Sequence, residues 1–125
     1  MDRFTVTQEI IDYQNAQPIY EGGWASDDDL KNNIEKYTTR VAIQEKKQIL
    51  SYFRHIMANR TATFAAAGRL PDPLTGERGV ISTRVFVDHE YTWGGWDVYM
   101  FEKYNLRLKD EFIDFVLGKS NGKIK

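Results

Sequence analysis

The sequence predicts a single compact α+β domain in which helices pack around a small antiparallel sheet. The chain has 125 residues, of which 42% are hydrophobic and 14% aromatic, and this is enough apolar surface for one hydrophobic core. Apolar residues recur at helical spacing in the middle and at the end of the chain, whereas they alternate along Ile81–Val87. We expect the domain to span residues 1–118 and residues 119–125 to form a flexible basic tail.

The N-terminal part contains one ambiguous segment, one loop and one clear helix start. Residues 4–11 fit neither period well, with a slight preference for helix. Pro18 and two adjacent glycines indicate a loop over residues 16–25. Ser26, followed by three aspartates, predicts a helix N-terminus, because its hydroxyl caps free amides and the carboxylates complement the helix dipole. Residues 27–58 are predicted to be mostly helical, with a break near Thr38-Thr39.

Three strands are predicted in the second half of the chain. A short strand is expected over residues 61–67, before a loop rich in glycine and proline. Ile81–Val87 has the alternation of a half-buried strand. Tyr91–Trp93 is expected to pair back on it across a turn at Asp88-His89-Glu90.

Two helices are predicted to follow this hairpin. Residues 95–104 are apolar around much of a helix, which predicts a helix enclosed by other elements and ended by Asn105. Residues 108–116 have the spacing of a closing amphipathic helix, which Gly118 would end.

Composition excludes several classes of protein. The chain has no cysteine, so it can form neither disulfides nor thiolate metal sites and needs no oxidising compartment. It has neither the pattern of a signal peptide nor a membrane-spanning apolar run, and we expect a cytoplasmic protein. The net charge of −1 does not favour binding of polyanions by the molecule as a whole.

Catalytic and metal chemistry are weakly supported by the residues. Asp88, His89 and Glu90 are consecutive on an extended segment, where side chains point to alternate faces and rarely enclose one ion. His55 beside Arg54 has no recognisable nucleophile partner. We therefore expect no metal, no cofactor and no enzymatic activity.

A group of acidic residues around two aromatics is the strongest candidate for a binding surface. Aromatic rings supply buried area at protein interfaces, while uncompensated charges accelerate the encounter with a basic partner. Helix capping with Trp24 in the core explains the same residues equally well. The predicted contacts are Glu21, Trp24, Asp27, Asp28 and Asp29, with Asp88 and Glu90 as a secondary acidic rim.

Residues 49–117 also resemble small bacterial immunity proteins of polymorphic and contact-dependent growth inhibition toxin systems. The similar segments are Ile49–Phe53, Asp88–Trp93 and Tyr99–Ile113, in which a turn precedes an aromatic residue and a tryptophan, and a tyrosine-rich helix follows. The chain differs from that pattern at His89, Gly94 and Lys109. The resemblance implies a protein that binds and neutralises a cognate toxin domain, and no binding residue follows from it.

We therefore expect a non-enzymatic immunity protein that occludes a basic toxin domain, for example a nuclease domain. One alternative is a small nucleic-acid-binding or nuclease-like protein centred on Lys46, Lys47, Arg54 and His55. Another is a homo-oligomeric structural protein that associates through the aromatic C-terminal unit.

Overall fold

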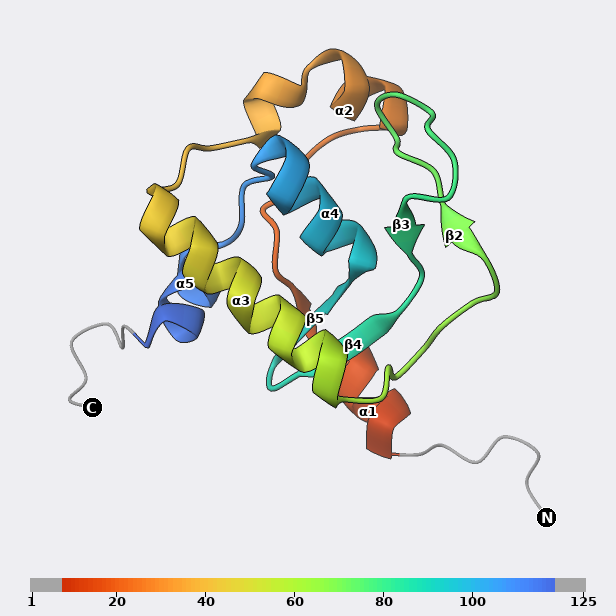
Figure 1. Ribbon diagram of the computed structural model, residues 1–125, viewed down its shortest axis with the longest axis vertical. Coiled ribbons are helices and arrows are strands. Elements are labelled where there is room, and N and C mark those ends of the chain that lie inside the picture. Colours follow the sequence, from red (N-terminus) through yellow and green to blue (C-terminus); the bar gives the residue numbers. More distant parts are fainter. Residues whose placement is uncertain (1–7, 119–125) are drawn as a thin grey trace.

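The computed structural model describes residues 8–118 and has the α+β architecture that the sequence predicts (Figure 1). Its elements are, in chain order, α1 (Gln8–Asn15), β1 (Gln17–Pro18), α2 (Asp27–Asn32), the 3-10 helix η1 (Ile34–Tyr37), α3 (Ile43–Asn59), β2 (Arg69–Leu70), β3 (Ile81–Ser82), β4 (Val85–Asp88), β5 (Tyr91–Gly94), α4 (Gly95–Tyr104) and α5 (Asp110–Leu117). The predicted tail, residues 119–125, and residues 4–7 of the ambiguous N-terminal segment lie outside the described range.

The predicted hairpin supplies two of the three strands of the larger sheet, with β5 in the centre. β4 and β5 pair antiparallel, with Phe86 opposite Trp93 and Asp88 opposite Tyr91. His89 takes a φ of 57° in the turn between them, a left-handed conformation in which a residue with a Cβ is uncommon. β1 pairs in parallel with the other edge of β5, so the sheet has the order β1-β5-β4. β2 and β3 form a separate two-stranded antiparallel ribbon.

The predicted helices are present, and their ends follow local signals. The Ser26 hydroxyl accepts a hydrogen bond from the Asp29 N–H at 3.1 Å, which confirms the predicted N-cap of α2. The expected break near Thr38-Thr39 falls between η1 and α3. Asn105 has a φ of 59° after α4, in the left-handed region that ends many helices.

Two strand predictions were wrong. Residues 61–67 contain only an isolated bridge between Phe64 and Val85, because the Thr63 and Phe64 amides both donate to the Val85 carbonyl and no regular ladder continues. The strand predicted over Ile81–Val87 is divided into β3 and β4 at Thr83 and Arg84.

Contact with the start of α4 accounts for this division. The Gly95 N–H donates to the Arg84 carbonyl at 3.0 Å. A Cβ on Gly94 would lie 2.6 Å from the Arg84 carbonyl oxygen, and one on Gly95 would lie 2.3 Å from that of Ser82. The two glycines therefore let α4 begin directly against the backbone that joins β3 to β4.

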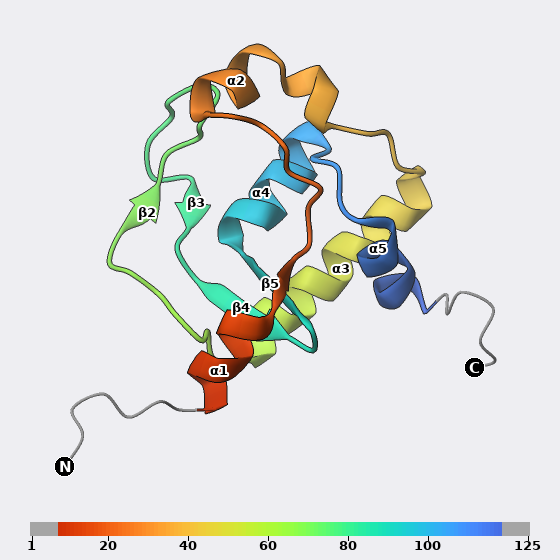
Figure 2. The same cartoon turned by 180° about the vertical axis from the view of Figure 1, so that it is seen from behind.

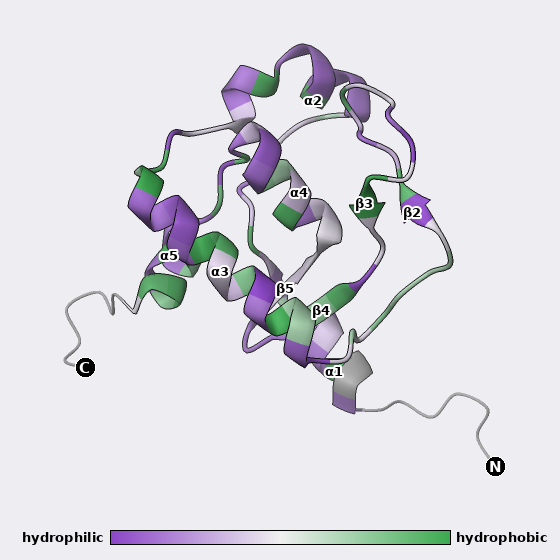
Figure 3. Cartoon of the chain, viewed as in Figure 1, coloured by the Kyte–Doolittle hydropathy of each residue, from purple (hydrophilic) through white to green (hydrophobic). Residues whose placement is uncertain are grey.

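Aromatic rings fill the core between the sheet, α3 and the two C-terminal helices. The Phe53 ring of α3 lies 4.7 Å from the Trp93 ring and 5.9 Å from the Phe112 ring, measured between centroids. All three side chains are buried. Hydrophobic and hydrophilic residues alternate along α3 as in an amphipathic helix, whereas α2 is mostly hydrophilic (Figure 3). Figure 2 shows α1 on the other side of the sheet from α3.

Candidate binding surface

Four half-buried aromatic side chains form one cluster where the 19–25 loop meets α4. We call Tyr20, Trp24, Tyr37 and Trp96 the aromatic cluster. The Tyr20 and Trp24 rings are stacked with centroids 5.3 Å apart, and Trp24 also contacts Trp96 at 6.0 Å and Tyr37 at 5.4 Å. Trp24, a predicted partner contact, lies at the centre of this partly exposed cluster.

The acidic residues beside the cluster divide into one structural and two free carboxylates. Asp29 accepts hydrogen bonds from the Tyr37 hydroxyl at 2.6 Å, from the Asn33 side chain at 2.8 Å and from the Ala25 amide at 2.9 Å. The hydrogen bond from Tyr37, followed by that from Ala25, lowers the pKa of Asp29. Asp27 and Asp28 are exposed in the first turn of α2, and the ion pairs of residues 8–118 involve neither of them. They are therefore available to a partner, whereas Asp29 holds the loop to η1.

Glu21 lies apart from Asp27 and Asp28. Its exposed side chain lines a shallow hollow with Lys109, Asp110 and Glu111 at the start of α5. Its backbone N–H donates to the Arg107 carbonyl at 3.0 Å. Glu21 thus extends the acidic surface toward α5 rather than toward α2.

The predicted acidic rim at Asp88 is wrong, because this side chain is 0% exposed. Its carboxylate accepts hydrogen bonds from the Tyr52 hydroxyl at 2.6 Å and the Trp93 indole at 3.1 Å, and the Arg60 guanidinium lies 3.7 Å away. Asp88 therefore joins α3 to the hairpin. Glu90 is exposed at the hairpin turn, at the opposite end of the molecule from α2 (Figures 1 and 2).

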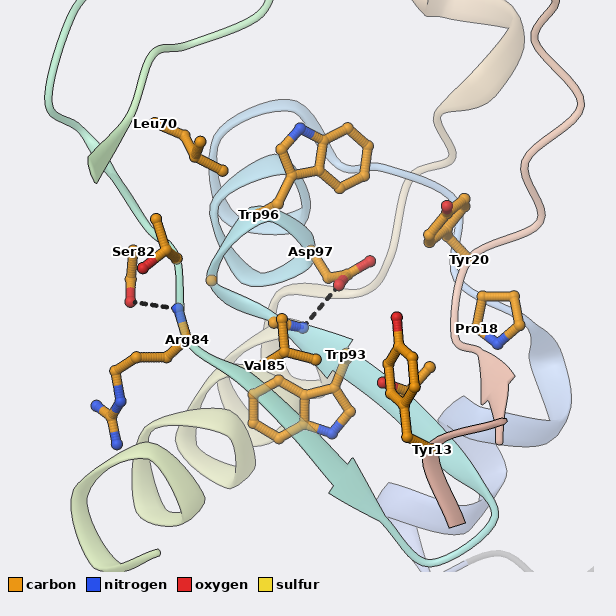
Figure 4. A pocket seen from close by; sticks show the side chains of 14 residues that line it. Tyr13, Pro18, Tyr20, Leu70, Ser82, Arg84, Val85, Trp93, Trp96 and Asp97 are labelled. Atoms are coloured by element: carbon orange, nitrogen blue, oxygen red, sulfur yellow. Dashed lines mark hydrogen bonds between the residues drawn. The ribbon is translucent and has the colours of Figure 1, made fainter. Parts of the chain in front are cut away.

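A pocket of about 340 Å³ opens beside the aromatic cluster, between α4 and the two sheets. Figure 4 shows Trp96 and Tyr20 on the walls of the pocket and Asp97 near its middle. Tyr13 and Leu70 lie nearer its margins. This volume is at the lower end of the range of about 300–1,000 Å³ for small-ligand sites. The pocket therefore has room for a small molecule or one long side chain.

Asp97 is the chemically unusual group of this pocket. It is 9% exposed, and one carboxyl oxygen accepts the Gly94 N–H at 2.7 Å. Burial raises the pKa of Asp97 to about 7, although hydrogen bonds from the Gly94 amide and its own amide partly oppose the shift. Burial and, secondarily, the Asp97 charge raise the pKa of Tyr20. A carboxyl group with a strongly shifted pKa in a pocket is a candidate functional group.

Neither Asp97 nor Trp96 was predicted to be a site residue. Gly94-Gly95 followed by an acid three residues after Gly94 is a signal for a helix start, but it predicts a cap rather than a pocket. Only the packing of α4 against Ser82 and Arg84 places this cap in a cavity.

A second buried carboxylate, that of Asp72, is enclosed by donors near the other end of α4. It is 1% exposed and accepts hydrogen bonds from the hydroxyls of Tyr99 and Tyr104, both at 2.6 Å, and from Lys103 at 3.2 Å. Burial alone would raise its pKa, but the hydrogen bonds from Tyr104 and Tyr99, and from nearby backbone amides, outweigh burial and hold the pKa well below its ordinary value. This group anchors the loop between β2 and β3 to α4.

The basic residues of α3 are mostly engaged within the fold. Lys46 donates to the Glu102 carbonyl at 2.9 Å and to the Asn105 side chain at 2.6 Å, and Arg54 forms an ion pair with Glu102. Lys47 and His55 are exposed. Two residues of the predicted polyanion-binding group therefore already have partners in the chain.

The two histidines make local contacts within residues 8–118. No group of three His, Asp or Glu side chains in this range has the geometry to hold a metal ion. His89 Nδ1 lies 2.9 Å from the Asp88 carboxylate, and its ring packs on Phe115 with centroids 4.9 Å apart. His55 lies beside Asn59 on the outer side of α3. These contacts give each histidine a local structural partner.

Comparison of the chain with protein families, curated proteins and solved structures finds no significant match. Across residues 8–118, no helix combines the length and apolar character needed to cross a bilayer. The function must therefore be argued from the surface and the pocket themselves.

Proposed function

We propose that this chain is a non-enzymatic immunity protein that binds a basic toxin domain and neutralises it by covering its working surface. The observation that carries the proposal is the half-buried aromatic cluster with the exposed carboxylates of Asp27 and Asp28 beside it. Interfaces concentrate binding energy in aromatic residues that lose their remaining exposure, while charges at the rim raise the rate and specificity of association.

The division of roles among the acids refines the proposed contact surface. Asp27 and Asp28 would meet basic groups of the partner, and Trp24 with Trp96 would supply the apolar centre. Asp29 would act indirectly, because its hydrogen bonds hold Tyr37 and the loop in place. Glu21 would contact the partner only if the interface extends toward α5.

The mechanism needs no chemistry from this chain. A nuclease domain must present a basic surface to its substrate, and an acidic protein surface competes for the same groups. We place this encounter in the cytoplasm, because the cysteine-free chain needs no oxidising compartment.

The test begins with identification of the partner. The tagged full chain is purified from its source cell, proteins recovered in near-equal amount are identified by mass spectrometry, and each is expressed with and without this chain in a growth assay. We expect a basic protein that arrests growth alone and not with this chain. Recovery of nucleic acid, or of self-associated chain alone, would contradict the proposal.

A charge-reversal pair then tests the surface. Asp27→Lys with Asp28→Lys should weaken binding of the captured protein by roughly tenfold or more, which corresponds to about 1.4 kcal/mol, and should remove protection. Asp12→Lys with Glu90→Lys is the matched control, because it makes the same charge change on exposed residues far from α2. Equal losses in both pairs would indicate only a general charge effect, and no loss in either would place the interface elsewhere.

A further inference from the structure

We propose that the pocket beside Trp96 is a site for an organic cation, a primary ammonium or guanidinium group that pairs with the Asp97 carboxylate. The cation can belong to a free small amine or to a lysine or arginine side chain of a protein. This inference does not depend on the proposed function.

The position of the carboxyl group is the first argument. Asp97 is more than nine-tenths buried, and only one of its oxygens is used by the hydrogen bond from Gly94. Figure 4 shows the other oxygen directed away from β5, toward the side of the pocket where Tyr20 lies. An oxygen of a largely buried side chain that is itself accessible from a cavity is suited to a donor from outside the chain.

The walls of the pocket are the second argument. The Trp96 and Tyr20 rings are tilted by 58° with centroids 5.7 Å apart, and both line the cavity. Aromatic faces attract ammonium and guanidinium groups, and tryptophan does so most strongly. Leu70 and Tyr13, which also line the cavity, offer apolar surface for the methylene stem of such a ligand.

Arg84, a basic side chain of this pocket, does not pair with Asp97. Arg84 also lines the cavity, but its guanidinium donates to the carbonyls of Met57 at 2.8 Å and Arg60 at 3.2 Å. In Figure 4 this group points away from Asp97. The other buried carboxylates, Asp72 and Asp88, have basic side chains beside them, whereas the ion pairs within residues 8–118 do not include Asp97.

Cation binding at this site should depend on pH. The titratable side chains that line the cavity are Asp97, Tyr13, Tyr20 and Arg84, and burial raises the pKa of Asp97 to about 7. A cation binds the ionised carboxylate, and the ionised fraction rises from about one tenth at pH 6 to about nine tenths at pH 8. The apparent affinity should therefore rise about tenfold over this interval.

The experiment is an NMR titration of the ¹⁵N-labelled full chain. The probes are the N-acetyl methylamides of lysine and arginine, with the norleucine derivative as a neutral control of similar shape. We expect saturable shifts of the Trp96 indole and the Gly94 and Gly95 amides with the cationic probes, about tenfold tighter at pH 8 than at pH 6. Equal binding of the norleucine derivative, or no saturable shift with any probe, would overturn the proposal.

Asp97→Asn supplies the matched variant, because asparagine keeps an acceptor for Gly94 and removes the charge. It should abolish the pH dependence and weaken cation binding by about tenfold or more. Unchanged binding in this variant would overturn the role of Asp97. If the variant does not fold, Trp96→Leu tests the wall instead and should weaken the cationic probes more than the norleucine derivative.

The same variant distinguishes the two sources of the cation. If Asp97→Asn weakens binding of the captured protein as well as of the probes, the cation is a side chain of that protein. If the probes alone are affected, the site takes a free small amine. A further outcome is that the probes fail to bind while Asp27→Lys with Asp28→Lys still weakens binding of the captured protein. That result would overturn this inference and leave the proposed function standing.

Discussion

Asp72, which is buried against α4, and Asp97, which is buried in the first turn of α4, have opposite surroundings. The Asp72 carboxylate is surrounded by two tyrosine hydroxyls, two backbone amides and a lysine. Asp97 accepts one hydrogen bond from another residue, the amide of Gly94, and faces a cavity. The comparison shows that burial alone does not determine what a carboxyl group does, because the number of donors that replace water decides which charge state is stable.

The two groups also have opposite effects on stability. The pKa of Asp72 is lowered in the folded state, so its contribution is present above the unfolded value near pH 4 and is lost as the pH falls through the folded pKa. The pKa of Asp97 is raised to about 7, so between about pH 4 and 7 the folded state binds the extra proton and stability decreases as the pH rises. One carboxyl group stabilises the fold at neutral pH, and the other destabilises it there.

The largest expected effect is that of Asp72→Ala. The substitution leaves the hydroxyls of Tyr99 and Tyr104 and two amides without their acceptor, so we expect a loss of roughly 3 to 5 kcal/mol in the free energy of unfolding. Urea unfolding at pH 7 measures it. Glu77→Ala, at an exposed acid of the same loop, is the control and should change stability by less than about 0.5 kcal/mol. A small loss for Asp72→Ala would mean that the loop is held by other contacts.

Asp97→Asn should have the opposite sign. The variant removes a charge that burial disfavours and keeps the cap, so it should be more stable than the natural protein by roughly 1 to 3 kcal/mol at pH 8. Near pH 3 the two proteins should be almost equally stable, because Asp97 is then protonated in both the folded and the unfolded state. Urea unfolding across pH 3–8 checks this, and a difference independent of pH would refute the raised pKa.

Tyr104→Phe should have a smaller effect at the Asp72 end. The change removes one donor to the carboxylate and keeps the ring, so we expect a loss of about 1 to 2 kcal/mol at pH 7. Because the remaining carboxylate is less well solvated, the pKa of Asp72 should rise toward its ordinary value. NMR titration of the Asp72 carboxyl carbon measures this shift, and an unchanged titration would show that Tyr99 and the amides suffice.

The smallest effect on stability is expected for Asp27→Lys with Asp28→Lys. Both side chains are exposed, and the cost should be limited to about 1 kcal/mol from the lost dipole interaction at the start of α2. Thermal unfolding measures it against Asp12→Lys with Glu90→Lys. A much larger loss would assign Asp27 and Asp28 to the fold, as Asp29 is, and remove them from the proposed binding surface.

Local signals were sufficient for most of the elements. The Ser26 cap predicted the start of α2, and Gly95–Tyr104 was predicted with the bounds that α4 has. The β4–β5 hairpin followed from alternation around one turn. Each of these features depends on residues a few positions apart, so short-range capping and periodicity determine them.

The sequence by itself determined the α+β class, the start of α2 and the bounds of α4, because periodicity and capping are properties of neighbouring residues. Only the tertiary structure decided what each carboxylate does. Asp88 was predicted to lie in a turn and lies in the core beside Tyr52 and Trp93, while Asp97, for which no role was predicted, lines a cavity. The donors that surround a carboxyl group come from distant parts of the chain, and the local sequence does not contain them.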